Sequence, residues 1–285
     1  MLDRKWAKFL KDNSFLVGLS IDGPAHVHDH YRRLSGGAPS FRSIRDRALL
    51  LLDAGVDVNA VAVINDYSVQ FPEEIYQSLK EIGFAHLQFI TCVETDSDDS
   101  SRAAAFSAPP EEYGRFLCRL FDLWMSGFNG GLPTTYIRFF ESVFFIYAGQ
   151  TPPDCTLQET CGTYLAIEHN GDVFPCDFFI ERGFRLGNVR SGRLVHMINS
   201  DMQRRFGHRK SVLPGPCRDC RWRNFCRGGC PKNRLRDPRD GGLDHFCASY
   251  RLFFQYAHER FISLANDWQH RHLKSRAIFK ADNKL

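Results

Sequence analysis

Residues 161–177 read Cys161-Gly-Thr-Tyr-Leu-Ala-Ile-Glu-His-Asn-Gly-Asp-Val-Phe-Pro-Cys-Asp177, and they set the character of the C-terminal half. At their centre, Asn170-Gly171 favours the two-residue turn of a β-hairpin between two short strands. Such a turn carries Cys176 back toward Cys161, which gives a geometric reason for the fourteen residues between them. The pattern predicts a small, hairpin-based region in which thiols are brought together.

Eight of the ten cysteines of the chain lie in one window, and their spacing indicates metal binding. The window reads Cys155-x5-Cys161-x14-Cys176 and, further on, Cys217-x2-Cys220-x5-Cys226-x3-Cys230-x16-Cys247. Four thiolates suit either one tetrahedral zinc ion or one four-iron cluster, so eight make two sites and one cysteine of the second group must complete the first. Zinc ribbons usually carry two C-x2-C pairs and this chain has one. The spacing favours two [4Fe-4S] clusters and leaves zinc as the alternative.

Composition narrows the class of protein. The net charge of +4 gives no reason to expect nucleic acid or a membrane surface as a partner. The apolar runs are far shorter than the roughly 18 residues of a spanning helix, and the charged N-terminus lacks a signal-peptide pattern. We therefore predict a cytoplasmic protein, in which cysteines bind metal rather than form disulfides. Cys92 and Cys118 stand apart in apolar stretches and are predicted to be buried side chains.

The first 150 residues alternate strand-like and helix-like patterns. Strands are predicted at 15–19, 58–64 and 86–91, and helices at 41–54, 72–82, 109–125 and 137–148. This alternation implies parallel strands with covering helices, in an open α/β sheet or a (β/α) barrel. Three strands are too few to close a barrel. The segment His26-Val-His-Asp-His30 is interpreted as a polar loop, with metal binding as the alternative.

A break in the pattern at 149–153 predicts a domain boundary at about residue 150. The expected division is 1–150 for the sheet and its helices, 151–250 for the cysteine-rich domain, and 251–285 for a C-terminal helix and tail. The last helix is predicted to end at Leu264 and to be followed by a frayed, charged tail.

Asp177 directly follows the third cysteine of the window. A carboxylate beside a metal ligand is suited to act as a general base on a bound substrate. A helix N-cap or an ordinary surface charge is the alternative interpretation.

These motifs resemble the SPASM domain of the radical S-adenosylmethionine enzymes, specifically that of the anaerobic sulfatase-maturating enzymes. The matching segments are 161–177, Leu186-Gly-Asn-Val189, Cys217-Arg-Asp-Cys220 and Cys226-Arg-Gly-Gly-Cys-Pro231, with Val17-Gly-Leu-Ser-Ile-Asp-Gly-Pro24 and Leu87-Gln-Phe-Ile90 upstream. The resemblance implies an α/β fold class: a partial radical SAM (β/α) barrel, then a small, loop-rich α+β SPASM iron-sulfur domain.

The resemblance also implies roles for single residues. Cys155, Cys161, Cys176 and Cys230 would ligate a first auxiliary [4Fe-4S] cluster, and Cys217, Cys220, Cys226 and Cys247 a second. Asp177 matches the proposed catalytic base of the family. Ser20 and Asp22 fall where the barrel borders the S-adenosylmethionine site.

The implied reaction oxidises a cysteine or serine of a sulfatase polypeptide to Cα-formylglycine, with an electron donor such as flavodoxin or ferredoxin. Full-length members of the family use S-adenosyl-L-methionine and a third [4Fe-4S] cluster. The C-x3-C-x2-C motif and the glycine-rich segment that bind these two are missing from this chain. We therefore expect that the chain alone cannot cleave S-adenosylmethionine. A maturase of another peptide target and a non-catalytic iron-sulfur module stay open as alternatives.

Overall fold

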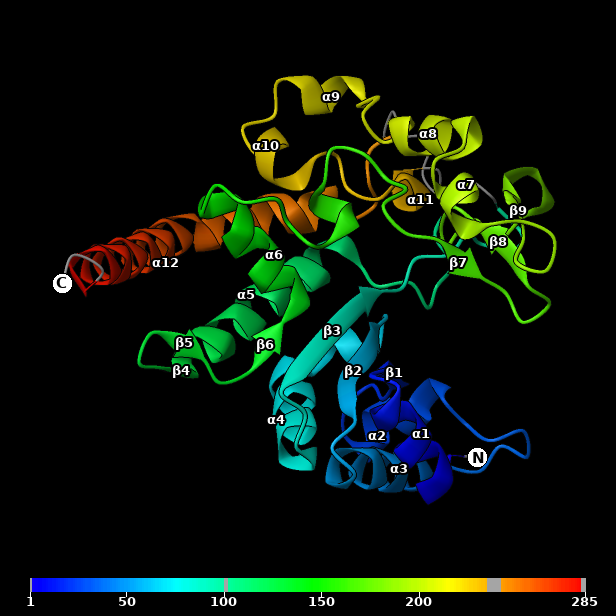
Figure 1. Cartoon of the computed structure of the whole chain (residues 1–285). Helices are drawn as coiled ribbons and strands as arrows, with labels where there is room; N and C mark the ends of the chain where they lie inside the picture. Colours follow the sequence, from blue (N-terminus) through cyan, green and yellow to red (C-terminus); the bar gives the residue numbers. More distant parts are fainter. Residues whose placement is uncertain (1, 100–101, 235–241, 283–285) are drawn as a thin grey trace.

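The computed structural model describes residues 2–99, 102–234 and 242–282, without the side chains of 272–282 (Figure 1). Its N-terminal half contains a parallel sheet with strand order β1-β2-β3-β6. The strands are β1 (Leu16–Ser20), β2 (Asp57–Ile64), β3 (His86–Thr91) and β6 (Tyr136–Ile137). The helices of this half are α1 (Arg4–Asp12), α2 (Ala25–Tyr31), α3 (Phe41–Asp53), η1 (Ser68–Gln70), α4 (Pro72–Ile82), α5 (Pro110–Ser126) and α6 (Arg138–Tyr147). The predicted α/β class is confirmed, and β6 is a fourth strand that the sequence pattern did not reveal.

The two faces of the sheet differ, as β2 shows. Val58, Ala60 and the other even-numbered residues are buried, whereas the odd-numbered residues are half-buried or exposed. Period-two alternation is expected when only one face of a strand is covered. On the open face, the Asn59 amide donates to Oε1 of Gln88 at 3.2 Å. This face of the sheet is only partly covered and carries polar side chains, and Gln88 on it lines the cavity described below.

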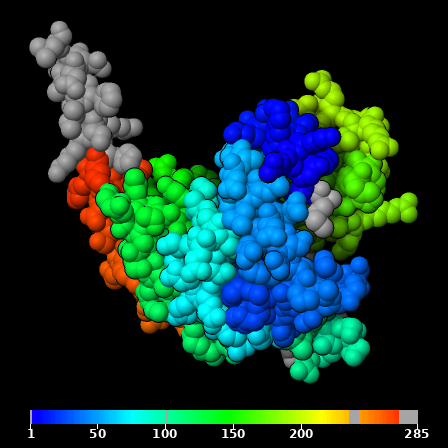
Figure 2. All heavy atoms as spheres, turned by 90° about the horizontal axis from the view of Figure 1, so that it is seen from below, coloured from blue at the N-terminus to red at the C-terminus, as the bar shows by residue number. Residues whose placement is uncertain are grey.

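The helices begin and end where the sequence dictates. Pro72 occupies the first turn of α4, where its missing N–H is harmless, and Glu73 and Glu74 in the same turn complement the helix dipole. Gly83 then ends the helix in the left-handed region, at φ 107°. Figure 2 shows α3, α4, α5 and α12 side by side on the outside, in the colour order from blue to orange.

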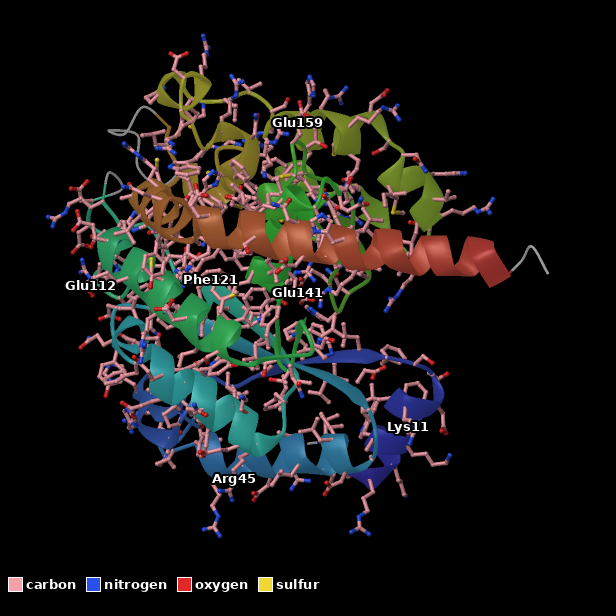
Figure 3. All side chains as sticks on the ribbon, turned by 90° about the vertical axis from the view of Figure 1, so that its left-hand side faces the viewer. Lys11, Arg45, Glu112, Phe121, Glu141 and Glu159 are labelled. Carbon is pink, nitrogen blue, oxygen red and sulfur yellow. The ribbon has the colours of Figure 1, made fainter. Side chains whose placement is uncertain are left out.

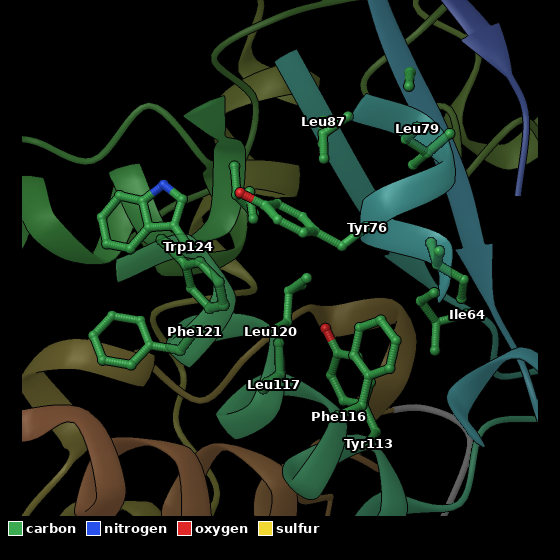
Figure 4. Close-up of a cluster of buried hydrophobic side chains, with 14 of the residues drawn as sticks. Ile64, Tyr76, Leu79, Leu87, Tyr113, Phe116, Leu117, Leu120, Phe121 and Trp124 are labelled. Carbon is green, nitrogen blue, oxygen red and sulfur yellow. The ribbon is translucent and has the colours of Figure 1, made fainter. Parts of the chain in front are cut away.

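The core lies between the sheet, α4 and α5, and continues to the C-terminal helix α12 (Cys247–Asp282). In Figure 4, Tyr76 and Leu79 of α4 face Leu87 of β3 and the apolar side of α5. Phe121 of α5 is fully buried, and its ring lies 4.8 Å from that of Phe261 of α12 (Figure 3). Close aromatic packing thus joins α12 to the sheet half.

The C-terminal half is built from short elements. A three-stranded antiparallel sheet has the order β7-β8-β9. Its strands are β7 (Ala166–Ile167), β8 (Asp172–Phe174) and β9 (Gly187–Asn188). A separate small hairpin in the N-terminal half pairs β4 (Phe128–Asn129) with β5 (Leu132–Pro133). The short helices are η2 (Cys155–Leu157), η3 (Arg182–Phe184), α7 (Leu194–Ile198), α8 (Asp201–His208), α9 (Gly215–Arg218), α10 (Arg223–Cys226) and α11 (Pro231–Arg234). The hairpin predicted at Asn170-Gly171 is present.

The boundary at about residue 150 stays a prediction. Helix α6 ends at Tyr147 and Gly149 takes a left-handed φ of 72°. However, Leu157 and Trp222 belong to the same buried cluster as Phe121. The cysteine-rich region and the sheet half therefore share one apolar core.

Two local predictions were wrong. The segment 26–30, interpreted as a loop, lies in helix α2, because buried His28 accepts a hydrogen bond from the Asp22 N–H at 3.2 Å and contacts Ser40 Oγ at 3.0 Å. The last helix does not stop at Leu264 but runs on to Asp282. Trp268 continues its packing, with its ring 6.0 Å from Phe144. Within the described residues, no helix has the length and apolar character needed to cross a membrane.

Candidate metal centre and active-site cavity

The hairpin and α8 position the first cysteines. Gly171 turns at φ 87°, which favours glycine, and β8 then leads directly to Cys176. The Cys161 N–H donates to the Gly207 carbonyl of α8 at 3.1 Å. A Cβ at Gly207 would lie 2.4 Å from the Cys161 carbonyl oxygen, so only glycine permits this approach.

Four thiols influence one another in a first group. Burial, Asp154 and the charges of Cys161 and Cys176 raise the pKa of Cys155 to about 11. Burial also raises the pKa of Cys230 to about 12, and Asp244, Cys161 and Cys155 add to that rise. Cys230 comes from the second sequence group, yet in space its thiol neighbours belong to the first. All are free thiols.

The remaining thiols of the window form a second group. Burial raises the pKa of Cys226 to about 12, with contributions from Asp244, Cys247 and Cys217. Burial likewise raises the pKa of Cys247 to about 11, and the charges of Cys217 and Cys220 contribute. Because such thiols are protonated near neutral pH, they would ligate a metal only by losing their protons to solvent as a strongly cationic centre binds.

The spacing of these side chains bears on which metal fits. Within the described residues, no three His, Cys, Asp or Glu side chains converge on a point where a single ion could sit. A structural zinc ion needs its four ligands around one point. A four-iron cluster distributes its four thiolates over separate irons and tolerates wider spacing. Two groups of four thiols, with wide separations along the sequence, supply the ligand sets of two such clusters.

A cavity of about 380 Å³ lies between the C-terminal end of β3 and the first thiol group. Its lining comes from three regions of the chain: Gln88 to Thr91 of β3, Arg138 and Phe139 of α6, and Cys155, Tyr164, Asp177 and Cys230 of the cysteine-rich region among others. In parallel sheets, ligands bind at the carboxyl ends of the strands. The cavity thus combines a strand-end position with thiols and the carboxylates of Asp154 and Asp177.

Asp177 is held at this cavity by Tyr164. The Tyr164 hydroxyl donates to Asp177 Oδ1 at 3.0 Å and lies 3.5 Å from the Cys176 sulfur. Partial burial and the neighbouring thiol and carboxylate raise the pKa of Tyr164, so the phenol stays protonated and remains a donor. Sequence reasoning missed Tyr164, because only the folded hairpin places its hydroxyl against both groups.

Ser20 and Asp22 lie at the C-terminal end of β1 but do not line the 380 Å³ cavity. Ser20 is exposed. Asp22 is buried, and its two oxygens accept from the Val63 N–H at 2.9 Å and from Arg32 Nε at 2.5 Å. Asp22 therefore ties β1, β2 and α2 together within the fold.

Buried charges surround the two thiol groups. Asp244 is 2% exposed, and its carboxylate accepts from the backbone N–H of Cys230 at 2.9 Å and of Phe246 at 2.7 Å. A Cβ at Gly229 would lie 2.0 Å from this carboxylate, so glycine is required there. Lys232, also buried, donates to Glu94 Oε1 and to the Val93 carbonyl, each at 2.7 Å. These links connect the cysteine-rich region to the loop after β3.

Comparison with known proteins identifies this chain, with its parallel sheet and clustered thiols, as an iron-sulfur protein. Residues 155–221 match the SPASM family, an iron-sulfur cluster-binding domain. The chain is 37% identical to a serine-type anaerobic sulfatase-maturating enzyme of Bacteroides thetaiotaomicron, over 90% of this chain and 65% of the relative. It is 32% identical to a cysteine-type enzyme of Clostridium perfringens, over 94% of this chain and 72% of the relative.

A solved structure also shows similarity to an anaerobic sulfatase-maturating enzyme. Native anSMEcpe with bound AdoMet and Cp18Cys peptide superposes with a TM-score of 0.83 at 32% identity, covering 93% of this chain and 74% of that one. The chain therefore belongs to the family of anaerobic sulfatase-maturating enzymes, the radical S-adenosylmethionine enzymes with a SPASM domain. It spans about two thirds of the length of these curated relatives.

Proposed function

We propose that this chain carries the auxiliary iron-sulfur centres and the acid–base residue of a sulfatase maturase. The observation that carries the proposal is the cavity that Asp177 shares with Cys155, Cys230 and the end of β3. The relatives are named as cysteine-type and serine-type enzymes, which supports a cysteine or serine of a sulfatase polypeptide as the target. The product would be Cα-formylglycine.

The proposed ligands follow the two thiol groups. Cys155, Cys161, Cys176 and Cys230 would hold one four-iron centre, and Cys217, Cys220, Cys226 and Cys247 the other. The mutual influence of these thiols on their pKa values supports this division. Their location in and beyond a matched iron-sulfur domain supports iron over zinc.

Asp177 is the proposed base. When bound, S-adenosylmethionine supplies the radical that removes hydrogen from the substrate Cβ, and the nearby iron-sulfur centre supplies an electron acceptor. Asp177 would accept the proton of the substrate thiol or hydroxyl. Tyr164 donates to Oδ1, and among the described residues Oδ2 has no hydrogen-bond partner. This second oxygen is the acceptor left for the substrate proton.

Ser20 and Asp22 are proposed to border the S-adenosylmethionine site in different ways. Exposed Ser20 would contact the cofactor directly. Asp22 would act through the backbone of Val63 and the guanidinium of Arg32, whose positions it fixes. The same proposal includes a flavodoxin or ferredoxin as the electron donor. It also includes a cytoplasmic location, which is supported by the free thiol state of every cysteine.

The first experiment is anaerobic reconstitution of the purified chain, followed by iron, sulfide and zinc analysis. We expect about eight irons per chain and a visible absorbance that dithionite bleaches. Cys155→Ser and Cys217→Ser should each reduce the iron content by about half, whereas Cys118→Ser should leave it unchanged. Two zinc ions and a colourless protein would defeat the proposal.

A second experiment tests the cavity. Binding of a labelled sulfatase peptide that presents cysteine or serine is measured by fluorescence anisotropy. Replacing Arg138 of the cavity wall with Ala should weaken binding, and replacing exposed Arg42 of α3 should not. Equal affinities for all three proteins would argue against this cavity as the peptide site.

A third experiment tests the radical step. Because the 285 residues contain no C-x3-C-x2-C motif, we propose that this polypeptide alone forms no 5′-deoxyadenosine from S-adenosylmethionine after reduction. Detection of that product by chromatography would contradict the proposal.

A further inference from the structure

Two lysines are buried beside the thiol groups, and their surroundings differ. Lys232 has a carboxylate partner, because its ammonium contacts Glu94 at 2.7 Å. Lys210 is 0% exposed, and its ammonium donates only to the backbone carbonyls of Cys155, at 2.9 Å, and Thr156, at 2.6 Å. Among the described residues, Lys210 has no carboxylate partner.

A buried ammonium without a counter-charge is costly, since isolated charges are strongly disfavoured in a protein interior. Burial lowers the pKa of Lys210, and the groups that oppose this when they are ionised are Cys161, Cys155, Cys230 and Cys226, in that order of effect. The first three belong to one thiol group. The compensating charge for Lys210 is therefore expected from thiolates of that group, and neutral thiols would leave it uncompensated.

Lys210 also joins the parts of the chain that this thiol group draws together. Its ammonium fixes the turn at Cys155 and Thr156 through two carbonyls. Its own carbonyl accepts from Arg234 at 2.7 Å, on the short helix α11 that follows Cys230. The residue thus touches both the start of the first cysteine segment and the segment that crosses over from the second.

We propose that Lys210 is a positioning residue for the centre held by Cys155, Cys161, Cys176 and Cys230, and that its charge makes this centre easier to reduce. The inference rests on the proposed function, because it requires a metal–thiolate centre in this group. A fixed cation stabilises a centre that gains an electron, and low dielectric surroundings strengthen this effect. Lys210 itself transfers neither electron nor proton.

The test compares three variants of the reconstituted chain. Lys210→Met keeps an unbranched apolar side chain of nearly the same length and removes its charge, and Lys210→Arg keeps the charge. Lys232→Met removes the other buried lysine, which already has a carboxylate partner. Each is analysed for iron and titrated with reductant, and the two centres are followed by electron paramagnetic resonance.

We expect Lys210→Met to lower the equilibrium constant for reduction of one centre at least tenfold, equivalent to 59 mV for a one-electron couple, while the other centre keeps its potential. Lys210→Arg and Lys232→Met should each change that constant less than threefold. If Lys210→Met instead loses the iron of one centre only, and Lys210→Arg restores it, the positioning role is supported.

Three results would overturn the inference: unchanged potentials with full iron in Lys210→Met, loss of both centres together, or no rescue by Lys210→Arg. A wild-type chain that binds no iron would refute the proposed function itself, which distinguishes the two failures.

Discussion

The sheet half and the cysteine-rich region of this chain are stabilised in different ways. The sheet half buries apolar side chains around Phe121, which packs against Trp124, Phe140, Phe253 and Phe261. The cysteine-rich region contributes only Leu157, Trp222, Phe246 and Tyr250 to the buried members of that core among the described residues. Its interior instead holds thiols and the buried charges of Lys210, Asp244 and Arg234. From this difference we expect the second region to depend on a metal to complete its interior.

Metal removal should produce the largest contrast between the two regions. Stripping iron with a chelator should reduce amide hydrogen-exchange protection at least about 100-fold across 161–234, because the thiols and Lys210 lose their shared partner. Protection in β2 and β3 should change less than about threefold, since apolar packing stabilises them. Equal loss in both regions, measured by mass spectrometry, would show that they do not differ as described.

The second largest effect is expected when a core side chain of the sheet half is truncated. Phe121→Ala should lower the free energy of unfolding by about 3–5 kcal/mol, because it removes a fully buried ring and leaves a cavity. Phe145, on neighbouring α6, is 39% exposed, so Phe145→Ala is the matched control, with an expected loss below about 1.5 kcal/mol. Urea unfolding of both variants measures the difference, and similar losses would contradict the assigned core.

Replacing a buried polar group of the cysteine-rich region should lower the free energy of unfolding less than Phe121→Ala does. Asp244→Asn places an amide N–H₂ near backbone N–H donors that the carboxylate now accepts, at an expected cost of about 1–3 kcal/mol. Asp219→Asn, at an exposed position, should change stability by less than about 0.5 kcal/mol. Thermal melting of the loaded proteins compares them, and the idea fails if the two melt alike.

The smallest effect is expected at the ion pair between α5 and α12. Asp122 accepts from Arg260 and from the Tyr256 hydroxyl, each at 2.7 Å. Burial acts to raise the pKa of Asp122, but these hydrogen bonds outweigh it and lower the pKa below 3.8. Stability from this group is therefore present above pH 3.8 and is lost as the pH falls through the lower folded value.

Because this pair is partly exposed, Asp122→Asn should cost at most about 1 kcal/mol at pH 7. The cost should vanish as the pH falls below the lowered pKa of Asp122 in the folded protein, in urea unfolding series at several pH values. If the cost of Asp122→Asn stays the same at low pH, it arises from packing rather than from charge.

Much of the sheet half was predictable because its signals are local. The apolar periodicity, Pro72 and Gly83 define α4 with the bounds predicted from the pattern. The helix α2 was not predictable in this way, because its histidine-rich sequence lacks an apolar stripe and His28 finds its partners in Asp22 and Ser40. The continuation of α12 past Leu264 depends on Phe144, which is distant in sequence.

The sequence by itself determined the hairpin at Asn170-Gly171, the eight clustered thiols and the carboxylate at Asp177, because turn chemistry and ligand identity are properties of the residues themselves. That Cys230 would join the first group was already expected from the cysteine count and the family resemblance. Tertiary structure alone decided that Tyr164 would donate to Asp177, and that Lys210 would be buried with no carboxylate partner among the described residues. These features depend on burial and on distances between segments remote in the chain, which only the folded packing fixes.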